Sequence, residues 1–396
     1  MNQHLSKPML WALLFGNLAV GMGIMVVPAT LTNMSDNLGI CISLTGQLIT
    51  AGAILMGVGA PLFAALVAKW DRRKLLTFTM AWYALFHGLC AIAPSFTFLM
   101  IARVLAVATP AIFTPQAAAC VGLLAQPAER TKAVTFIFLG WSISSVFGVP
   151  ILASIGGYAV GGEGWRWAFA LVAVVATISS IWVWRVLPSG IQIAPLGKAA
   201  WIGVLKHRVL MMTVGVTLLS AFAQFVLFSY LTAYYKQTLG ATATDISLLF
   251  FWFGLCGLIG SVALARNIER IGADRAPIIA MSLMASSLLL WPLGTSVITV
   301  MAICTPWGLG SFASNSSQQA RLSSAAPLVA GASIALNTSA MYSGQAFGAG
   351  LGGWLIAHNL MGSLHWWGFA VMLCAIGLSS WSRRQLASQA QISLPP

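Results

Sequence analysis

Two ionisable side chains, His87 and Arg103, lie within long apolar runs, where His87 could bind a proton and Arg103 could be displaced by one. Imidazole exchanges a proton near neutral pH, and an Arg in an apolar run costs several kcal/mol unless it is paired or faces water. A neutral, structural His87 and an Arg103 that reaches the surface or bonds backbone carbonyls remain open alternatives. The 7 acidic residues fall instead at or near the ends of apolar runs: Asp36, Asp71, Glu129, Glu163, Asp245, Glu269 and Asp274.

Other catalytic or ligand-binding patterns are missing from the sequence. It contains no phosphate-binding Gly-x-x-x-x-Gly-Lys-Ser/Thr, no His-Glu-x-x-His and no nucleophile elbow, so neither direct use of ATP nor an intramembrane enzyme is expected. The 6 Cys residues are scattered singly, without Cys-x-x-Cys or clustering with His. We therefore expect no metal, no disulfide and no cofactor.

The elements that position His87 and Arg103 are predicted to be membrane-spanning helices. The composition is 59% hydrophobic and 7% charged, with a mean hydropathy of +0.89, and no soluble domain covers its surface with so few charges. The first run, about 20 residues from Met9 to Thr30, lacks a cleavage site and is interpreted as a retained span. Twelve spans are predicted, roughly at 9–30, 45–67, 75–94, 97–124, 132–160, 166–187, 209–235, 245–268, 276–295, 297–318, 328–356 and 365–382.

The net charge of +13 is interpreted as a topology signal and not as a nucleic-acid surface. Only Arg103, Arg166 and Lys236 of the 20 Lys and Arg residues lie outside the termini and the alternate loops on one side. Such an excess marks the cytoplasmic face of a membrane protein. Both termini are therefore predicted to be cytoplasmic.

The sequence divides into two related halves. A polar interruption at 188–208, with Pro188, Gly190, Pro195 and Gly197 as breakers, separates six spans (1–187) from six spans (209–396). A shift of about 200 residues superimposes the halves, so that the basic turn at 69–74 falls on 269–275. Parallel six-span repeats are typical of transporters that bind substrate at the midplane and work by alternating access.

The turn within residues 59–76 resembles a motif of the major facilitator superfamily, and more narrowly of its bacterial twelve-span drug:proton antiporters, which include sugar, nucleoside and antibiotic exporters. The motif usually reads Gly-x-Leu-Ala-Asp-Arg-x-Gly-Arg-Arg. Arg72 and Arg73 match it, whereas the Asp position is Ala68 and Asp71 occupies the Gly position. The resemblance implies a conformational latch between the halves, formed by Asp71, Arg72, Arg73, Glu269 and Arg270.

Three further stretches resemble the same family. Ile101-Ala102-Arg103-Val104-Leu105 is similar to its Arg-containing motif in span 4. Span 11 has the small-residue face of the family, interpreted as packing, at Gly344, Gly348, Gly350, Gly352 and Gly353. Span 5 is similar to the motif that marks exporters, in which Gly permits close helix approach and Pro bends the helix; its residues are Gly140, Gly148, Pro150, Gly156 and Gly157.

The resemblance also implies which residues carry out transport. Many relatives place an acid in span 1, where this chain has Asn17, so the candidates for proton coupling are His87, Asp36 and Arg103 acting by displacement. Each uncharged candidate could instead be an interhelical hydrogen bond. Residues expected to line a pocket for a neutral or weakly polar molecule are Asn17, Arg103, Gln116, Gln224, Phe228, Trp307, Asn315, Asn337 and Gln345.

These features favour a monomeric, proton-coupled exporter of a drug or metabolite, located in a bacterial inner membrane. Its expected partners are a small-molecule substrate, protons and the lipid bilayer. A facilitator or proton symporter on the same all-α fold is an alternative, because no intramembrane acid is present. A membrane sensor or scaffold is disfavoured because the short loops leave no domain for signalling.

Overall fold

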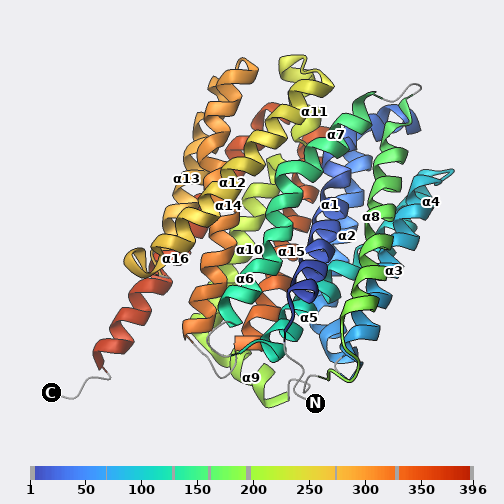
Figure 1. Ribbon diagram of the computed structural model, residues 1–396. Coiled ribbons are helices and arrows are strands. Elements are labelled where there is room, and N and C mark those ends of the chain that lie inside the picture. The colour runs from blue at the N-terminus through green and yellow to red at the C-terminus, as the bar shows by residue number, and fades with distance from the viewer. Residues whose placement is uncertain are drawn as a thin grey trace. The chain divides into compact units, whose positions relative to one another are not determined.

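The computed structural model describes residues 5–67, 69–126, 130–158, 162–192, 198–272, 274–325 and 330–392. Helices connected by short turns make up these ranges, and no strand occurs within them (Figure 1). Ala68 and Glu129 lie outside the described residues, as does the side chain of Glu269. The interpretations placed on these three therefore stay predictions.

The first half supplies the helices that surround His87 and Arg103. Short side-chain caps begin two of them: Asp71 accepts from the N–H of Lys74, and Ser95 accepts from that of Phe98. The elements are α1 (Lys7–Leu38), α2 (Ile42–Leu66), α3 (Arg72–Ala91), α4 (Phe96–Ala106), α5 (Ala108–Leu124), α6 (Arg130–Ile143), the π-helical turn η1 (Ser144–Gly148), α7 (Val149–Tyr158) and α8 (Gly164–Val186).

The second half has the corresponding elements, preceded by a short helix in the polar interruption. These are α9 (Lys198–Lys206), α10 (Arg208–Phe228), α11 (Leu231–Leu239), α12 (Ala243–Ile271), α13 (Ala276–Leu290), the 3₁₀ turn η3 (Trp291–Leu293), α14 (Val297–Ala325), α15 (Ala330–Ala357), the 3₁₀ turn η5 (Met361–Ser363) and α16 (Leu364–Ile392). Every predicted span has a helical counterpart in the described residues.

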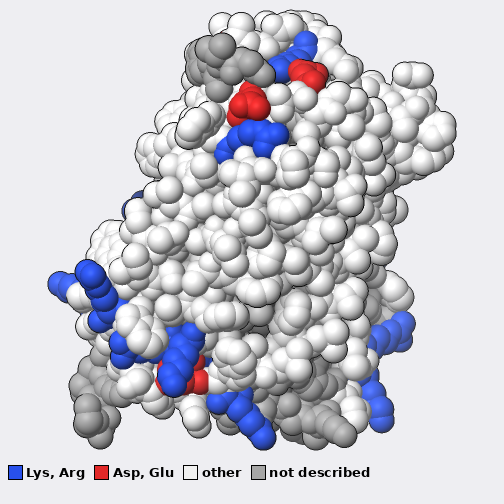
Figure 2. Space-filling model, turned by 90° about the vertical axis from the view of Figure 1, so that its right-hand side faces the viewer, with Lys and Arg blue, Asp and Glu red and all other residues white. Residues whose placement is uncertain are grey.

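Ten helical stretches of the described residues are long and apolar enough to cross a membrane. The predicted all-α membrane fold is confirmed. The other two predicted spans correspond to α3, whose first residues are Arg72, Arg73 and Lys74, and to α15, which is rich in Gly, Ala and Ser. Figure 2 shows charged side chains near both ends of the visible face and a broad band of other residues between them.

The chain forms two compact units. The first comprises Met1–Pro195 together with Tyr230–Gly254, and the second comprises Leu196–Ser229 and Leu255–Pro396. Helix α11 and the first part of α12 therefore pack with the first unit, although they belong to the second half of the sequence. The hydroxyl of Thr232 in α11 donates to the carbonyl oxygen of Pro28 in α1 at 3.0 Å.

Glycines bring α6, η1 and α7 close to α1 in the first unit. A Cβ on Gly140 would overlap the Leu14 carbonyl; Cβ atoms on Gly148 and Gly156 would lie 2.6 Å from Met22 and 2.8 Å from Thr30. The three glycines are spaced by eight residues and so recur about every two turns of helix. The close approach expected from their small size is present.

Candidate functional site

A proline inside α1 creates an acceptor for Arg103. Pro28 has no backbone N–H, so the carbonyl of Ile24, four residues earlier, lacks its usual helical partner. Nη2 of Arg103 donates to this oxygen at 3.2 Å, and Nη1 donates to the carbonyl oxygen of Gly23 at 2.6 Å. Arg103 is 3% exposed, so α1 binds a buried cation through its backbone.

The imidazole of His87 lies against the same guanidinium. Nη1 of Arg103 is 3.3 Å from Nε2 of His87, and Nδ1 of His87 is 2.9 Å from the carbonyl oxygen of Tyr83. Because a guanidinium has only donors, Nε2 must accept and Nδ1 must carry the proton that is donated to Tyr83. The contact with Arg103 therefore favours a neutral His87 that carries its proton on Nδ1.

Gly23 makes room for two side chains of α3 against the backbone of α1. A Cβ at this position would lie 2.7 Å from Nε2 of His87 and would also overlap the hydroxyl of Tyr83. That hydroxyl donates to the carbonyl oxygen of Val20 at 3.1 Å. Gly23, Ile24, Tyr83, His87 and Arg103 are called the Arg103 cluster below, and all lie in the first unit.

No carboxylate compensates Arg103 in this arrangement. Among the described residues no Asp or Glu side chain is buried, and Asp36, the third predicted coupling residue, is exposed near the end of α1. Within the described part of the chain, Nε of Arg103 has no hydrogen-bond partner. The charge is therefore stabilised by carbonyl dipoles and one neutral base, which makes it sensitive to protonation of that base.

Asn17 is placed between three helices, with both ends of its amide hydrogen-bonded. Its Nδ2 donates to the carbonyl oxygen of Ile137 in α6 at 3.1 Å, and its Oδ1 accepts from Thr114 in α5 at 2.8 Å. The side chain is completely buried. These contacts favour the interhelical hydrogen bond that the sequence left open beside substrate binding.

The second unit contains a related contact between an Asn and a neighbouring helix. Here the Asn lies on α15 and its partner on α10, whereas in the first unit the Asn lies on α1. Thr217 of α10 donates to Oδ1 of Asn337 in α15 at 2.6 Å, and the two residues are 120 positions apart, as are Asn17 and Ile137. Nδ2 of Asn337 has no hydrogen-bond partner among the described residues although the residue is buried. Asn337 therefore keeps a donor that Asn17 has already used.

The remaining predicted pocket residues are found singly or in pairs. The rings of Phe228 and Trp307 are 6.1 Å apart; Gln224 donates to the carbonyl oxygen of its own helix at Ser220; Gln116 and Gln345 are buried. Oδ1 of Asn315 is buried without a partner in the described ranges. Sequence reasoning missed Gln318, one helical turn further along α14, which is 1% exposed and has neither amide atom paired within those ranges.

The basic turn is bound to the segment that follows α8. Asp71 accepts from the N–H of Gly190, and the N–H of Arg72 donates to Ile191 at 2.9 Å. Arg72 is buried and also donates to the carbonyl oxygen of Val67, whereas Arg73 lies 4.2 Å above the ring of Trp184. These contacts are internal to the first unit, and the predicted latch between halves stays a prediction.

In the corresponding turn of the second half, the contacts are made by Arg321, which the sequence placed among the basic loop residues and not in a functional site. Nε of Arg321 lies 2.8 Å from Oδ1 of Asp274, and its Nη atoms contact the hydroxyls of Ser379 and Ser382 in α16. Burial lowers the pKa of Arg321 from its ordinary value, and Asp274 opposes this effect. Arg270, predicted for the latch, is exposed. Arg321 was missed because α14 continues beyond its apolar stretch, Val297–Gln319.

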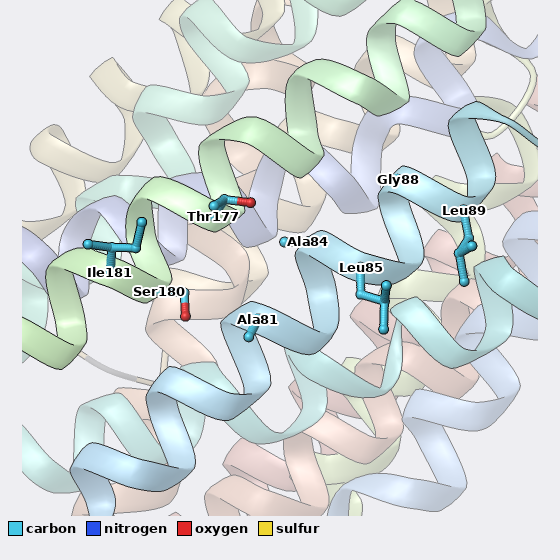
Figure 3. A pocket seen from close by; sticks show the side chains of 8 residues that line it. All are labelled: Ala81, Ala84, Leu85, Gly88, Leu89, Thr177, Ser180 and Ile181. Carbon is cyan, nitrogen blue, oxygen red and sulfur yellow. The ribbon is translucent and has the colours of Figure 1, made fainter.

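A groove between α3 and α8 has a volume of about 460 Å³ (Figure 3). Its lining is mostly apolar, and none of the predicted site residues contributes to it: Ala81, Ala84, Leu85, Gly88, Leu89, Thr177, Ser180 and Ile181. Leu85 and Ile181 are exposed. The groove therefore gives no support to a polar binding site.

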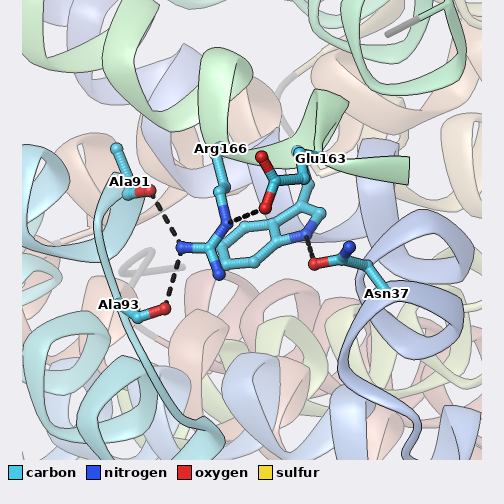
Figure 4. Close-up of polar contacts among 6 residues, drawn as sticks. Asn37, Ala91, Ala93, Glu163 and Arg166 are labelled. Carbon is cyan, nitrogen blue, oxygen red and sulfur yellow. Dashed lines mark hydrogen bonds and ion pairs between the residues drawn. The ribbon is translucent and has the colours of Figure 1, made fainter. Parts of the chain in front are cut away.

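The Gly164-Trp165-Arg166 stretch, at the start of α8, contacts the C-terminal ends of α1 and α3 (Figure 4). Arg166 donates to the carbonyl oxygens of Ala91 and Ala93 and pairs with Glu163 at 3.5 Å. Its guanidinium lies 4.3 Å above the ring of Trp165, whose indole N–H donates to Asn37 at 3.0 Å. These partners are structural, so Arg166 caps the carbonyl end of α3.

Residues 13–349 match the family model described as "Major Facilitator Superfamily". The chain is 26% identical over 351 residues to "Inner membrane transport protein YdhP" of Escherichia coli (strain K12), which covers 89% of each chain. It is 27% identical over 338 residues to a "Probable sugar efflux transporter" of Helicobacter pylori (strain ATCC 700392 / 26695), covering 84% of each. The crystal structure of a D-xylose-proton symporter has the same fold, with a TM-score of 0.77, 17% identity and coverage of 94% of this chain and 96% of that one.

The family match and the relatives named as transporters show a multi-pass membrane transporter and not an enzyme. The match over most of its length shows that the chain belongs to the Major Facilitator Superfamily. The family predicted from the basic turn, Arg103 and the span 5 glycines is therefore confirmed.

Proposed function

We propose that this transporter exports a small, neutral, polar compound in exchange for protons, and that sugars are the first substrate class to test. The observation that carries the proposal is the contact between His87 and Arg103, which places a titratable base against a buried cation without a carboxylate. The relatives named as sugar efflux transporters support the direction and the substrate class.

The proposed coupling step is a proton exchange at one atom. A proton from the outside binds Nε2 of His87, whose lone pair now accepts from Arg103. The resulting imidazolium repels the guanidinium, which must leave its position as α1 and α4 rearrange. Release of the proton to the inside restores the neutral imidazole and the contact, and the proton balance of one cycle is one proton inward.

The polar atoms without partners support substrate contacts in the second unit. Asn315, Asn337 and Gln318 each keep an amide atom without a hydrogen bond in the described part of the chain, and such atoms gain free energy when a hydroxyl-rich ligand pairs with them. Gln224, Gln345, Phe228 and Trp307 are further proposed contacts. Asn17, Gln116 and Arg103 remain candidates from the first unit.

The proposed setting is a bacterial inner membrane, with a monomer whose two termini are cytoplasmic and whose units alternate access to the substrate. The basic loops support this orientation, and the name of the Escherichia coli relative supports the membrane. A latch formed by Asp71, Arg72, Arg73, Glu269 and Arg270 is also proposed, to which Arg321 and Asp274 are added.

Transport into inside-out vesicles tests the proposal. Vesicles from cells with and without the protein are given ¹⁴C-labelled neutral pentoses and hexoses while the lumen is held more acidic than the medium. Accumulation that a protonophore abolishes is expected. Equilibration without accumulation would identify a facilitator, and accumulation only with an acidic medium would identify a symporter. If no sugar moves, a drug and metabolite susceptibility panel identifies the substrate class.

A further inference from the structure

We infer that Pro28 is a positioning residue for proton coupling: by freeing the carbonyl of Ile24, it holds the guanidinium of Arg103 against the imidazole of His87. The inference rests on the proposed coupling by these two residues. Pro28 itself touches neither the proton nor the substrate. It acts through the single backbone oxygen that its missing N–H leaves unpaired.

The geometry separates the two oxygens that bind Arg103. The carbonyl of Gly23 has Val27 as its regular helical donor, so Nη1 shares that oxygen, whereas Pro28 provides no i+4 donor for the carbonyl of Ile24, to which Nη2 donates. Nη2 makes no other contact in the Arg103 cluster. The Ile24 oxygen therefore fixes the second corner of the guanidinium, and with it the plane in which Nη1 reaches His87.

Gly23 makes this orientation possible, because the absence of a Cβ lets the side chains of Tyr83 and His87 lie against the backbone of α1. The hydroxyl of Thr232 donates to the carbonyl oxygen of Pro28 itself, which is not one of the oxygens that bind Arg103. A residue with an N–H at position 28 would compete with Nη2 for the Ile24 oxygen.

Pro28→Ala tests the inference because alanine restores that N–H and favours a regular helix, so the variant is expected to fold. The matched control is Pro115→Ala, which removes the proline inside α5 of the same unit. A second control, Thr232→Val, removes only the contact to the carbonyl of Pro28. A third variant carries lactic acid at position 28, which lacks both the ring and the N–H.

The first readout is the ¹⁵N NMR spectrum of histidine-labelled full-length protein in lipid bilayers, with His87 assigned from the spectrum of His87→Asn. In the wild type, His87 is expected to show one tautomer, with an unprotonated Nε2. Pro28→Ala should lose at least half of that signal at pH 6, whereas both control variants and the lactic acid variant should retain it.

The second readout is the pH profile of transport in the vesicles. Weaker contact with the cation makes protonation of His87 easier, so the profile of Pro28→Ala should move to higher pH by about one unit. An unchanged His87 spectrum in Pro28→Ala overturns the inference. Equal changes in the alanine and lactic acid variants also overturn it, because they would assign the effect to the ring. If the spectrum changes as expected but transport ignores pH, the positioning role stands and the proposed coupling is wrong.

Discussion

Nη1 of Arg103 lies 3.3 Å from Nε2 of His87, and the same nitrogen donates to the backbone of α1. A cation and a titratable base therefore share one buried site in which each fixes the state of the other. Neither residue can change its charge or position without affecting α1.

Arg103→Ala should reduce transport at least 100-fold while the protein still reaches the membrane. The substitution removes the cation that changes position during coupling, and it also removes the desolvation penalty of a buried charge without a carboxylate, so the fold should persist. Transport and the amount of monodisperse protein in detergent measure the two effects. Arg166→Ala is the control, since that side chain caps α3; unchanged transport in Arg103→Ala would assign Arg103 to structure.

His87→Asn should uncouple transport from the pH gradient. Asn can accept from Arg103 through its amide oxygen but cannot bind a proton. Exchange of substrate between the two sides should continue, whereas accumulation against a gradient should be lost. The measurement compares counterflow with pH-driven uptake in the same vesicles. Continued accumulation would show that another residue carries the proton.

Asn17→Leu and Gln224→Leu should have different effects. Asn17 makes two buried hydrogen bonds to other helices, so its loss should lower the free energy of unfolding by about 1–3 kcal/mol. Gln224 bonds only its own helix, so its replacement should change the order of substrate preference with little change in thermal stability. Thermal unfolding and competition between unlabelled sugars measure the two outcomes; the reverse pattern would move substrate binding to Asn17.

Asp274→Asn should destabilise the second unit more than the pair of substitutions Asp274→Asn and Arg321→Met. The single substitution leaves Arg321, which is 2% exposed, without its carboxylate, whereas the double substitution removes the charge as well. We expect a loss of about 1.5–3 kcal/mol for the single variant, because Asp274 is 45% exposed and partly screened. A double-mutant cycle on thermal stability measures the coupling, and additive effects would contradict it.

Gly140→Ala and Gly122→Ala should shift stability in opposite directions. A methyl group at 140 overlaps the backbone of α1, and such overpacking costs about 1–3 kcal/mol. No atom lies within 4 Å of a Cβ at 122, where Ala should stabilise the helix by about 0.5–1 kcal/mol. Melting temperatures of the two variants against the wild type test this, and equal shifts would argue against close α1–α6 packing.

The sequence predicted the fold well because membrane spans depend on composition and length, which are local properties. It also identified His87 and Arg103 separately. Their contact was within reach of sequence reasoning: the two are 16 residues apart, on either side of the turn before α4, and so lie at similar depth in a helical hairpin. The binding of Arg103 by the carbonyl oxygens of Gly23 and Ile24 could not be predicted. Gly23 is 80 residues away in the sequence, and nothing local specifies which face of α1 Arg103 reaches.

Buried polar residues were harder to interpret than apolar ones. The same residue type, Asn, is hydrogen-bonded through both its nitrogen and its oxygen at 17 and keeps, among the described residues, an unpaired nitrogen at 337, a difference that depends on neighbours from other helices. Arg321 was assigned to a loop because charge normally ends a span, whereas here Asp274 and two serines allow the helix to continue.

The contact between Thr232 and Pro28 affects where the chain could be cut into two separately expressed fragments. Two separately expressed fragments cut at the polar interruption would follow the sequence repeat, yet the N-terminal fragment would lack Tyr230–Gly254, which packs with it in the intact chain. The carbonyl oxygen of Pro28 would then lose the hydroxyl that donates to it. For such fragments to restore transport together, the C-terminal fragment would have to supply Tyr230–Gly254 to the N-terminal one. Assembly of the fragments would therefore show that α11 had bound to the first unit.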